Sequence, residues 1–207
     1  MANAGNRPFG LRPKHPLGAS DWSGKLRPYY MPSTYASNVF IGDPVIWTGT
    51  SNTAVVTAIG GEFGIATLPE INLATVGSGN KVTGVVCGFM ATNRDSPIYG
   101  AASTERVALV CDHPFMIYEI QDDGGGALAA VTVGLDAVLI AGAGSTYTGL
   151  SAYALDGGTA TAPAANAAYQ LKIIGAANIP GNDATSDYAV WNVLINIPSY
   201  ANGVAGV

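Results

Sequence analysis

The chain has 207 residues, of which only 11% are charged and 27 are glycine, whereas about 25% of the residues in an average protein are charged. Its longest apolar stretch, residues 127–144, is interrupted by Gly134 and Asp136, which argues against a membrane-spanning helix. Residues 1–10 lack the apolar core of a secretory signal peptide. We therefore expect a soluble protein with no membrane partner.

The N-terminal segment is basic and rich in proline. Residues 1–27 hold five of the nine cations and one of the 14 carboxylates, so the rest of the chain is strongly acidic. Five prolines lie within residues 1–32, and proline fixes φ and lacks a backbone donor. We therefore predict that residues 1–35 form an extended arm outside the core, and that residues 201–207 form a flexible tail.

Residues 36–200 read as a series of short strands. The runs are rich in Val, Ile, Thr and Tyr and are separated by Gly, Asp and Pro turn signals. About ten such strands predict an all-β fold, which we interpret as a jelly-roll-like β-sandwich body. The predicted strands lie within residues 38–49, 53–61, 81–90, 105–112, 115–121, 129–133, 137–141, 145–155, 170–176 and 188–197.

The triplet Cys111-Asp112-His113 contains the groups of a thiol nucleophile and its base. A catalytic thiol needs an imidazole within hydrogen-bond reach and a third group that orients the ring. Neighbouring side chains on a strand point to opposite faces, so these three residues should diverge, and we interpret them as a strand end followed by a turn. Cys87 and Cys111 both lie in apolar runs, which favours two buried free thiols, with one cross-strand disulfide as the alternative.

No cofactor site emerges from the remaining motifs. The two histidines, His15 and His113, and the two cysteines have none of the spacings of a zinc site. The acidic segments 122–126 and 181–187 lack the alternating pattern of a calcium loop and read as turns. Residues 18–26 resemble a phosphate-binding loop, but the glycine spacing is wrong and Leu26 stands where Ser or Thr is required. We predict no catalytic residue, no metal and no cofactor.

The arm carries the candidate binding residues. Its cations alternate with aromatic side chains, a combination that can follow a nucleic acid backbone and stack on bases. The acidic body would repel such a ligand, so we expect a protein partner and no nucleic acid; a neighbouring copy of the chain supplies a suitable acidic surface. The predicted partner-binding residues are Arg7, Phe9, Arg12, Lys14, Trp22, Lys25 and Arg27.

Five stretches resemble a family of small tailed-phage structural proteins, the head cement or decoration proteins. They are NRPFGLRP (6–13), YYMPSTYASNVFIGDPV (29–45), STERVALVCDHPFMIYEIQ (103–121), GSTYTGLSAYALD (144–156) and LKIIGAANIPGNDATSDYAVWNVLIN (171–196). The resemblance covers most of the chain, but these are framework motifs and carry no chemistry. In that family the turn at 112–114 is usually acidic and has no neighbouring Cys–His pair.

The resemblance implies a noncatalytic virion protein, made in the host cytoplasm, that binds the outer surface of the phage head. Its partners would be the major capsid protein and further copies of itself; a trimer over threefold junctions is favoured over a dimer across twofolds, and the sequence does not decide between the two. It would cement neighbouring capsomers and stabilise the expanded capsid, with many modest contacts acting together.

Two other classes remain open. A tail- or fibre-associated β-sandwich that binds host glycans would use exposed aromatic residues such as Tyr147, Tyr153 and Tyr200. A cupin-like enzyme would share the jelly roll, but it needs a cluster of histidines and this chain has two.

Overall fold

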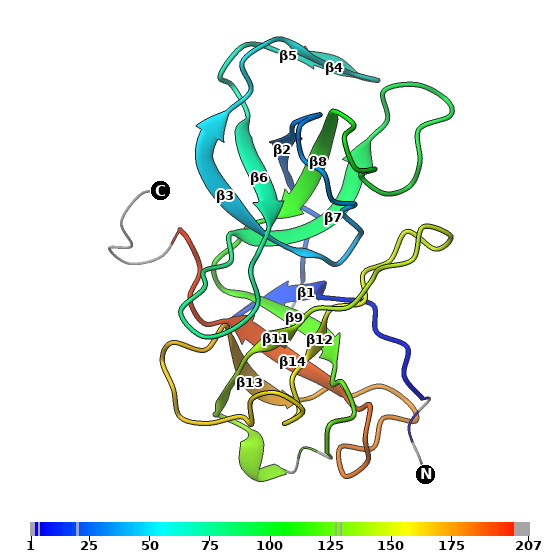
Figure 1. Ribbon diagram of the computed structural model, residues 1–207. Coiled ribbons are helices and arrows are strands. Elements are labelled where there is room, and N and C mark those ends of the chain that lie inside the picture. Colours follow the sequence, from blue (N-terminus) through cyan, green and yellow to red (C-terminus); the bar gives the residue numbers. More distant parts are fainter. Residues whose placement is uncertain (1–2, 4, 20, 127, 129, 201–207) are drawn as a thin grey trace.

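The computed structural model describes residues 3, 5–19, 21–126, 128 and 130–200. The fold is nearly all β, with 38% of the residues in strands, which confirms the predicted fold class. The strands form two lobes, one above the other (Figure 1). Within the described residues, no helix has the length and apolar character needed to cross a bilayer. The predicted tail, residues 201–207, lies outside the described residues.

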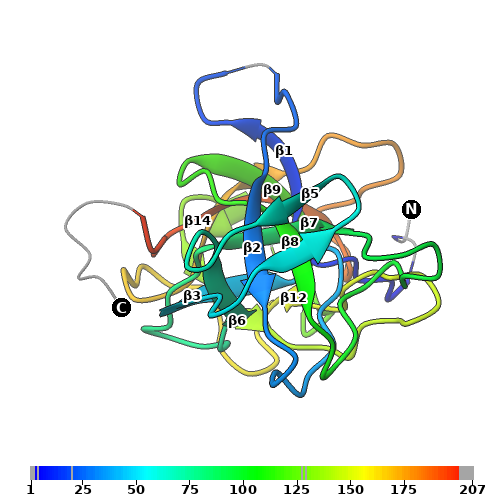
Figure 2. The same ribbon diagram turned by 90° about the horizontal axis from the view of Figure 1, so that it is seen from above.

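The upper lobe is a closed five-stranded barrel, and Figure 2 views the molecule from the barrel end. All its strand pairs are antiparallel except β2–β6, which is parallel. Closing the barrel buries a cluster that includes Tyr29, Val45, Ile71 and Val110. In barrel order the strands are β2 (Arg27–Met31), β6 (Pro69–Leu73), β3 (Pro44–Ser51), β7 (Gly84–Met90) and β8 (Arg106–Cys111).

The lower lobe is a five-stranded antiparallel sheet. The largest buried cluster forms on it and includes Tyr118, Leu171 and the fully buried Trp191. In sheet order the strands are β1 (Arg12–Pro16), β9 (Met116–Gln121), β14 (Val190–Ile195), β13 (Leu171–Ala176) and β10 (Asp136–Ala137).

Three small elements complete the fold. A hairpin of β4 (Val56–Ala58) and β5 (Gly61–Phe63) stands at the top of the barrel lobe (Figure 1). The strands β11 (Leu139–Ile140) and β12 (Ala154–Leu155) form a short pair, and β12 packs against β9. A 3₁₀ turn, η1 (Ala130–Thr132), occupies a segment that we predicted as a strand, residues 129–133.

The prediction that residues 1–35 lie outside the core is wrong. β1 is an edge strand of the sheet and β2 is a strand of the barrel, while Leu11, Tyr29 and Met31 are each only 1% exposed. The prolines mislead because φ near −65° is compatible with extended backbone, and an edge strand has one side on which a missing N–H costs no hydrogen bond.

The jelly-roll arrangement is not confirmed. The described strands form a closed barrel and a separate sheet, whereas a jelly roll consists of two facing sheets. The domain boundary predicted at residue 35 also differs from the division into lobes, because the first two strands belong to different lobes and the N-terminal segment ties them together.

Candidate functional site at the waist

The waist is the surface between the two lobes, where the segment from Arg7 to Arg27 passes from the sheet to the barrel. The connection from β1 to β2 runs along the outside of the molecule (Figure 2). It carries Trp22, which is half-buried, packs against the main core and lines two hollows. The segment that we predicted as an arm therefore forms a fixed part of this surface.

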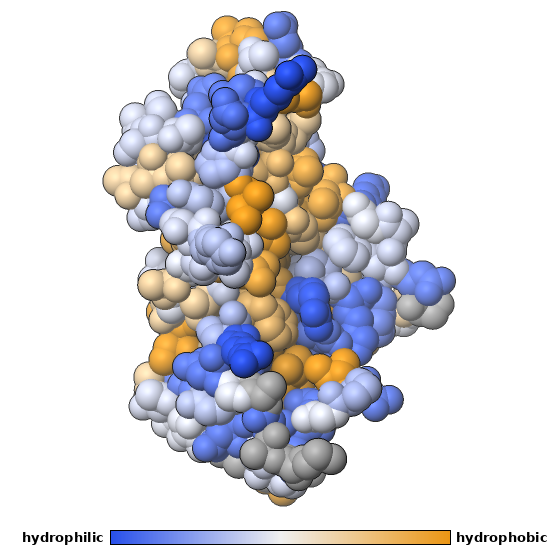
Figure 3. Space-filling view, turned by 90° about the vertical axis from the view of Figure 1, so that its right-hand side faces the viewer, coloured by the Kyte–Doolittle hydropathy of each residue, from blue (hydrophilic) through white to orange (hydrophobic). Residues whose placement is uncertain are grey.

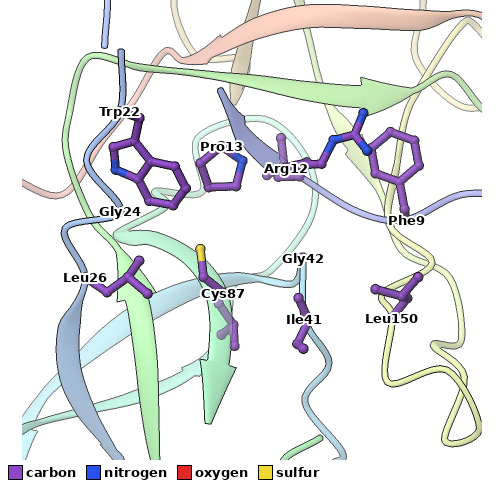
Figure 4. A pocket seen from close by; sticks show the side chains of 12 residues that line it. Phe9, Arg12, Pro13, Trp22, Gly24, Leu26, Ile41, Gly42, Cys87 and Leu150 are labelled. Atoms are coloured by element: carbon purple, nitrogen blue, oxygen red, sulfur yellow. The ribbon is translucent and has the colours of Figure 1, made fainter. Parts of the chain in front are cut away.

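The apolar hollow has a volume of about 400 Å³, which lies within the range of roughly 300–1,000 Å³ typical of ligand pockets. Arg12 is its only charged lining residue, and the Arg12 guanidinium lies 4.9 Å from the centroid of the Phe9 ring. Cys87 directs its sulfur toward Pro13 and Trp22 (Figure 4). The lining consists of Phe9, Leu11, Arg12, Pro13, Trp22, Gly24, Leu26, Ile41, Gly42, Val86, Cys87 and Leu150.

The polar hollow has a similar volume, about 400 Å³. Two of its lining residues bind the buried Tyr29, whose hydroxyl donates to Asp112 Oδ2 at 2.8 Å and lies 2.9 Å from the Tyr200 hydroxyl. Burial, followed by these two hydrogen bonds, raises the pKa of Tyr29 well above its ordinary value, so this hydroxyl stays protonated. The lining consists of Pro16, Asp21, Trp22, Ser23, Lys25, Arg27, Asp112, His113, Pro114, Met116 and Tyr200.

Most waist cations are placed by carboxylates of their own chain. Arg12 and Lys14 both contact Glu119 of β9, and the Lys14 ammonium also donates to Asn192 Oδ1 at 3.3 Å. Arg27 lies 3.4 Å from Asp112. The expected acidic surface of a neighbouring copy is therefore not needed to neutralise them, since the chain's own sheet and barrel supply carboxylates.

Two predicted cations face solvent at the waist. The Arg7 backbone N–H donates to Gln121 Oε1 at 2.9 Å, which fixes the position of this residue on the sheet lobe. Within the described part of the chain, neither the Arg7 nor the Lys25 side chain has an ion-pair partner. Both side chains are exposed and available to a carboxylate of another molecule.

Of the seven predicted binding residues, five line one of the two hollows, and Arg7 and Lys14 do not. Phe9, Arg12 and Trp22 line the apolar hollow, and Trp22, Lys25 and Arg27 line the polar hollow. Sequence reasoning named Tyr200 only as a candidate glycan-binding residue and missed Ile41, Cys87 and Leu150, which come from distant segments. No local pattern marks them, because only the packing of the two lobes brings them to the waist.

The side chains of Cys111, Asp112 and His113 do not converge. Cys111 is fully buried, and burial raises the pKa of its thiol. Asp112 accepts the hydrogen bond from Tyr29, while His113 Nδ1 accepts the Phe115 backbone N–H at 3.2 Å within its own turn. Both cysteines are free thiols, as the more direct sequence interpretation expected. Nothing in this geometry activates the sulfur as a nucleophile.

Among the residues that the structure describes, no three His, Cys, Asp or Glu side chains gather as metal ligands do. The acidic segments instead cap loops. Asp122 accepts hydrogen bonds from the backbone N–H groups of Gly124, Tyr188 and Ala189, and from Trp191 Nε1. Its buried carboxylate thus joins the 122–126 loop to β14.

Comparisons with known proteins identify no relative of the chain: no family model, no curated protein and no solved structure matches it.

Proposed function

We propose that the chain is a noncatalytic structural protein of a phage virion that binds the outside of the head and cements neighbouring capsomers. The proposal rests on the resemblance of its framework segments to head cement proteins, together with the construction of the waist. A cement subunit needs a rigid body that presents fixed contact groups, since many modest contacts then act together. The major capsid protein and further copies of the chain are the partners in this proposal, and the outer head surface is its location.

The observation that carries the proposal is the fixed basic rim of the waist on an otherwise acidic molecule. Glu119, Gln121 and Asp112 hold the cationic segment in place, so little ordering entropy is lost when a partner binds. Arg7 and Lys25 remain exposed on that rim. Complementary charge at such a rim raises the association rate and fixes orientation more than it adds affinity.

The structure changes which experiment tests this proposal. Deleting residues 1–30 would remove β1 and most of β2, so loss of head binding would report unfolding. Charge reversal at exposed positions avoids this problem. The double variant Arg7→Glu/Lys25→Glu should remain folded and bind expanded heads more weakly, with the largest effect at low ionic strength.

The matched control is Arg94→Glu, which reverses an exposed cation on the loop between β7 and β8, away from the waist. It should bind heads as the wild-type protein does. Quantitative mass spectrometry of intact virions gives the second measurement, and hundreds of copies in a simple ratio to the major capsid protein are expected. A few copies per virion, or an unchanged affinity of Arg7→Glu/Lys25→Glu for heads, would contradict the proposal.

Glycan binding is the second candidate, and one observation favours it. The polar hollow combines the aromatic Trp22 and the 39% exposed Tyr200 with hydroxyl, carboxylate and cationic groups, a mixture that suits a saccharide. Tyr153 was predicted to be an exposed aromatic residue of such a site, but it is 6% exposed and lies in the core. Tyr147 is 93% exposed. A glycan-array signal that Tyr200→Ala abolishes and Tyr147→Ala retains would support this alternative.

A further inference from the structure

The β4–β5 hairpin presents an apolar outer face to solvent. Val56 and Ala58 point inward and are buried, so the alternation of the strand places Thr57 on the opposite face, and Val55 and Ile59 flank the strand at its two ends. Val55 is 51% exposed and Ile59 is 57% exposed. Apolar side chains gather at this end of the molecule, above the barrel, in the space-filling view (Figure 3).

The hairpin is tethered to the barrel by a backbone hydrogen bond, and its charge is negative. The Ile59 backbone N–H donates to the Ala91 carbonyl at 2.6 Å, which ties the turn to the end of β7. Glu62 pairs with Thr57 across the hairpin and is exposed. Residues 53–67 contain this one carboxylate and no cation, so the outer face is apolar with a negative centre.

The apolar hollow at the waist has the complementary character. Its lining is aliphatic and aromatic, Arg12 is its only charged residue, and Leu150 at its rim is 40% exposed. An apolar band also runs down the middle of the face in Figure 3, between the two ends of the molecule. Exposed apolar patches on a water-soluble surface mark sites of association.

The two surfaces cannot meet within one molecule. The hairpin stands at the top of the barrel, whereas β1, which borders the hollow, lies between the lobes (Figure 1). We propose that the outer face of the β4–β5 hairpin of one copy docks in the apolar hollow of a second copy, with Glu62 placed toward Arg12. The contact is head-to-tail, so it builds a ring if the rotation closes and a chain if it does not.

Strand addition is the main competing mode of association, and the edges oppose it. The barrel is closed and has no free edge. Of the two edge strands of the five-stranded sheet, β1 contains Pro13 and Pro16, which lack the backbone N–H donors that a new strand would need, and β10 is already bridged by Ala164. Association through side chains in the hollow therefore fits the structure better than pairing of backbones.

The test is the mass of the full chain in solution, which does not depend on heads and so can fail separately from the proposed function. The wild-type protein should have a mass that is a multiple of 21.0 kDa and that falls on dilution, measured by sedimentation or light scattering. Ile59→Asp damages the hairpin face and Leu150→Asp damages the hollow. Both side chains are substantially exposed, so both variants should fold and should be monomers.

Mixing the two variants distinguishes the proposed head-to-tail contact from a symmetric contact. Ile59→Asp retains an intact hollow and Leu150→Asp retains an intact hairpin, so one good contact forms per pair and the mixture should give dimers and nothing larger. Val131→Ser, which removes an 83% exposed apolar side chain from η1 in the sheet lobe, is the control and should associate like the wild type. A monomeric wild type, an unchanged mass in either Asp variant, or a mixture that stays monomeric would each overturn the proposal.

Discussion

Glu119 of β9 accepts hydrogen bonds from both Nε and Nη2 of Arg12 in β1, at 3.1 and 2.5 Å. Lys14 Nζ lies 3.1 Å from the other oxygen of the same carboxylate. The Glu119 side chain is only 8% exposed, so one nearly buried carboxylate binds two cations of the edge strand. This arrangement holds the basic N-terminal segment on its own sheet.

Removing that charge should loosen β1. Burial raises the pKa of Glu119, but the hydrogen bonds and charges of Arg12 and Lys14 lower it by a larger amount. The pKa of Glu119 therefore lies below its ordinary value. The ionised Glu119 therefore contributes its full stabilisation of the folded state at pH values above its unfolded-state pKa. This contribution is lost as the pH falls through its folded-state pKa. At pH 7 we expect Glu119→Gln to lower the free energy of unfolding by about 1–2 kcal/mol and to speed hydrogen exchange in β1. The exposed Asp95→Asn is the control, and unchanged exchange in β1 of Glu119→Gln would contradict the role of Glu119.

Asp43 should give the protein a stability that decreases with rising pH. Burial raises its pKa to about 6, although hydrogen bonds from Ser151 and from the Phe40 backbone N–H act in the opposite direction. The folded state therefore binds the proton more tightly than the unfolded state. The free energy of unfolding should fall by about 2 kcal/mol as the pH rises from 4 to 7.

Asp43→Asn removes this charge and retains an oxygen that can accept the Phe40 N–H. We expect urea unfolding of Asp43→Asn to depend less on pH between 4 and 7 than unfolding of the wild type. The exposed Asp95→Asn should keep the wild-type dependence. Parallel curves for Asp43→Asn and the wild type would show that the buried carboxylate does not titrate in this range.

Cys87 should react slowly with thiol reagents even though its sulfur lines an open hollow. Burial raises the pKa of Cys87 to about 12, and the thiolate is the reactive form. At pH 8 the thiolate fraction should be about 10⁻⁴, against roughly a quarter for a free cysteine of ordinary pKa. Alkylation followed by mass spectrometry at several pH values measures this, and the rate should still be rising above pH 10. Rapid labelling that levels off near pH 9 would indicate an ordinary solvated thiol.

Arg106 should lower the stability of the barrel. It is 2% exposed, and burial lowers the pKa of its guanidinium. Nη2 donates to the Pro97 carbonyl at 3.2 Å, whereas Nε and Nη1 have no partner among the described residues. An unpaired buried charge is costly, and replacing it with an apolar group of similar size can stabilise a protein.

We expect Arg106→Met to raise the free energy of unfolding by about 1 kcal/mol or more. Arg106→Lys keeps the charge but loses the guanidinium that lies 5.6 Å from the Phe89 ring centroid, so it should lower stability. Chemical denaturation of both variants separates the two effects. An equal decrease in the free energy of unfolding of both variants would mean that Arg106 stabilises the barrel by packing that neither Met nor Lys replaces.

Several strands could be predicted from sequence because their signals are local. The segments predicted at 105–112, 115–121, 170–176 and 188–197 contain β8, β9, β13 and β14. Each is a run of β-branched and aromatic residues bounded by turn residues, and such a run favours a pleated, buried surface wherever its partner lies. The same reasoning placed both cysteines in apolar surroundings.

The errors arose where the partner strand decides the outcome. Residues 12–16 and 27–31 contain prolines and cations, yet they form β1 and β2 because Glu119 of β9 and the backbone of β8 bind them. The opposite error occurred at 129–133, where β-favouring residues form η1. A strand exists only when another strand satisfies its backbone groups, and that partner can be a hundred residues away.

By itself, the sequence determined the all-β class, the positions of the central strands and the divergence of Cys111, Asp112 and His113, because each follows from local propensity or from strand alternation. It also identified residues of the waist, since basic and aromatic side chains concentrate in residues 7–27. Only the tertiary structure decided that this segment joins two lobes, and that Cys87, Leu150 and Tyr200 meet it there. Strand pairing and closure of the barrel are long-range contacts, and no local pattern encodes which segments they bring together.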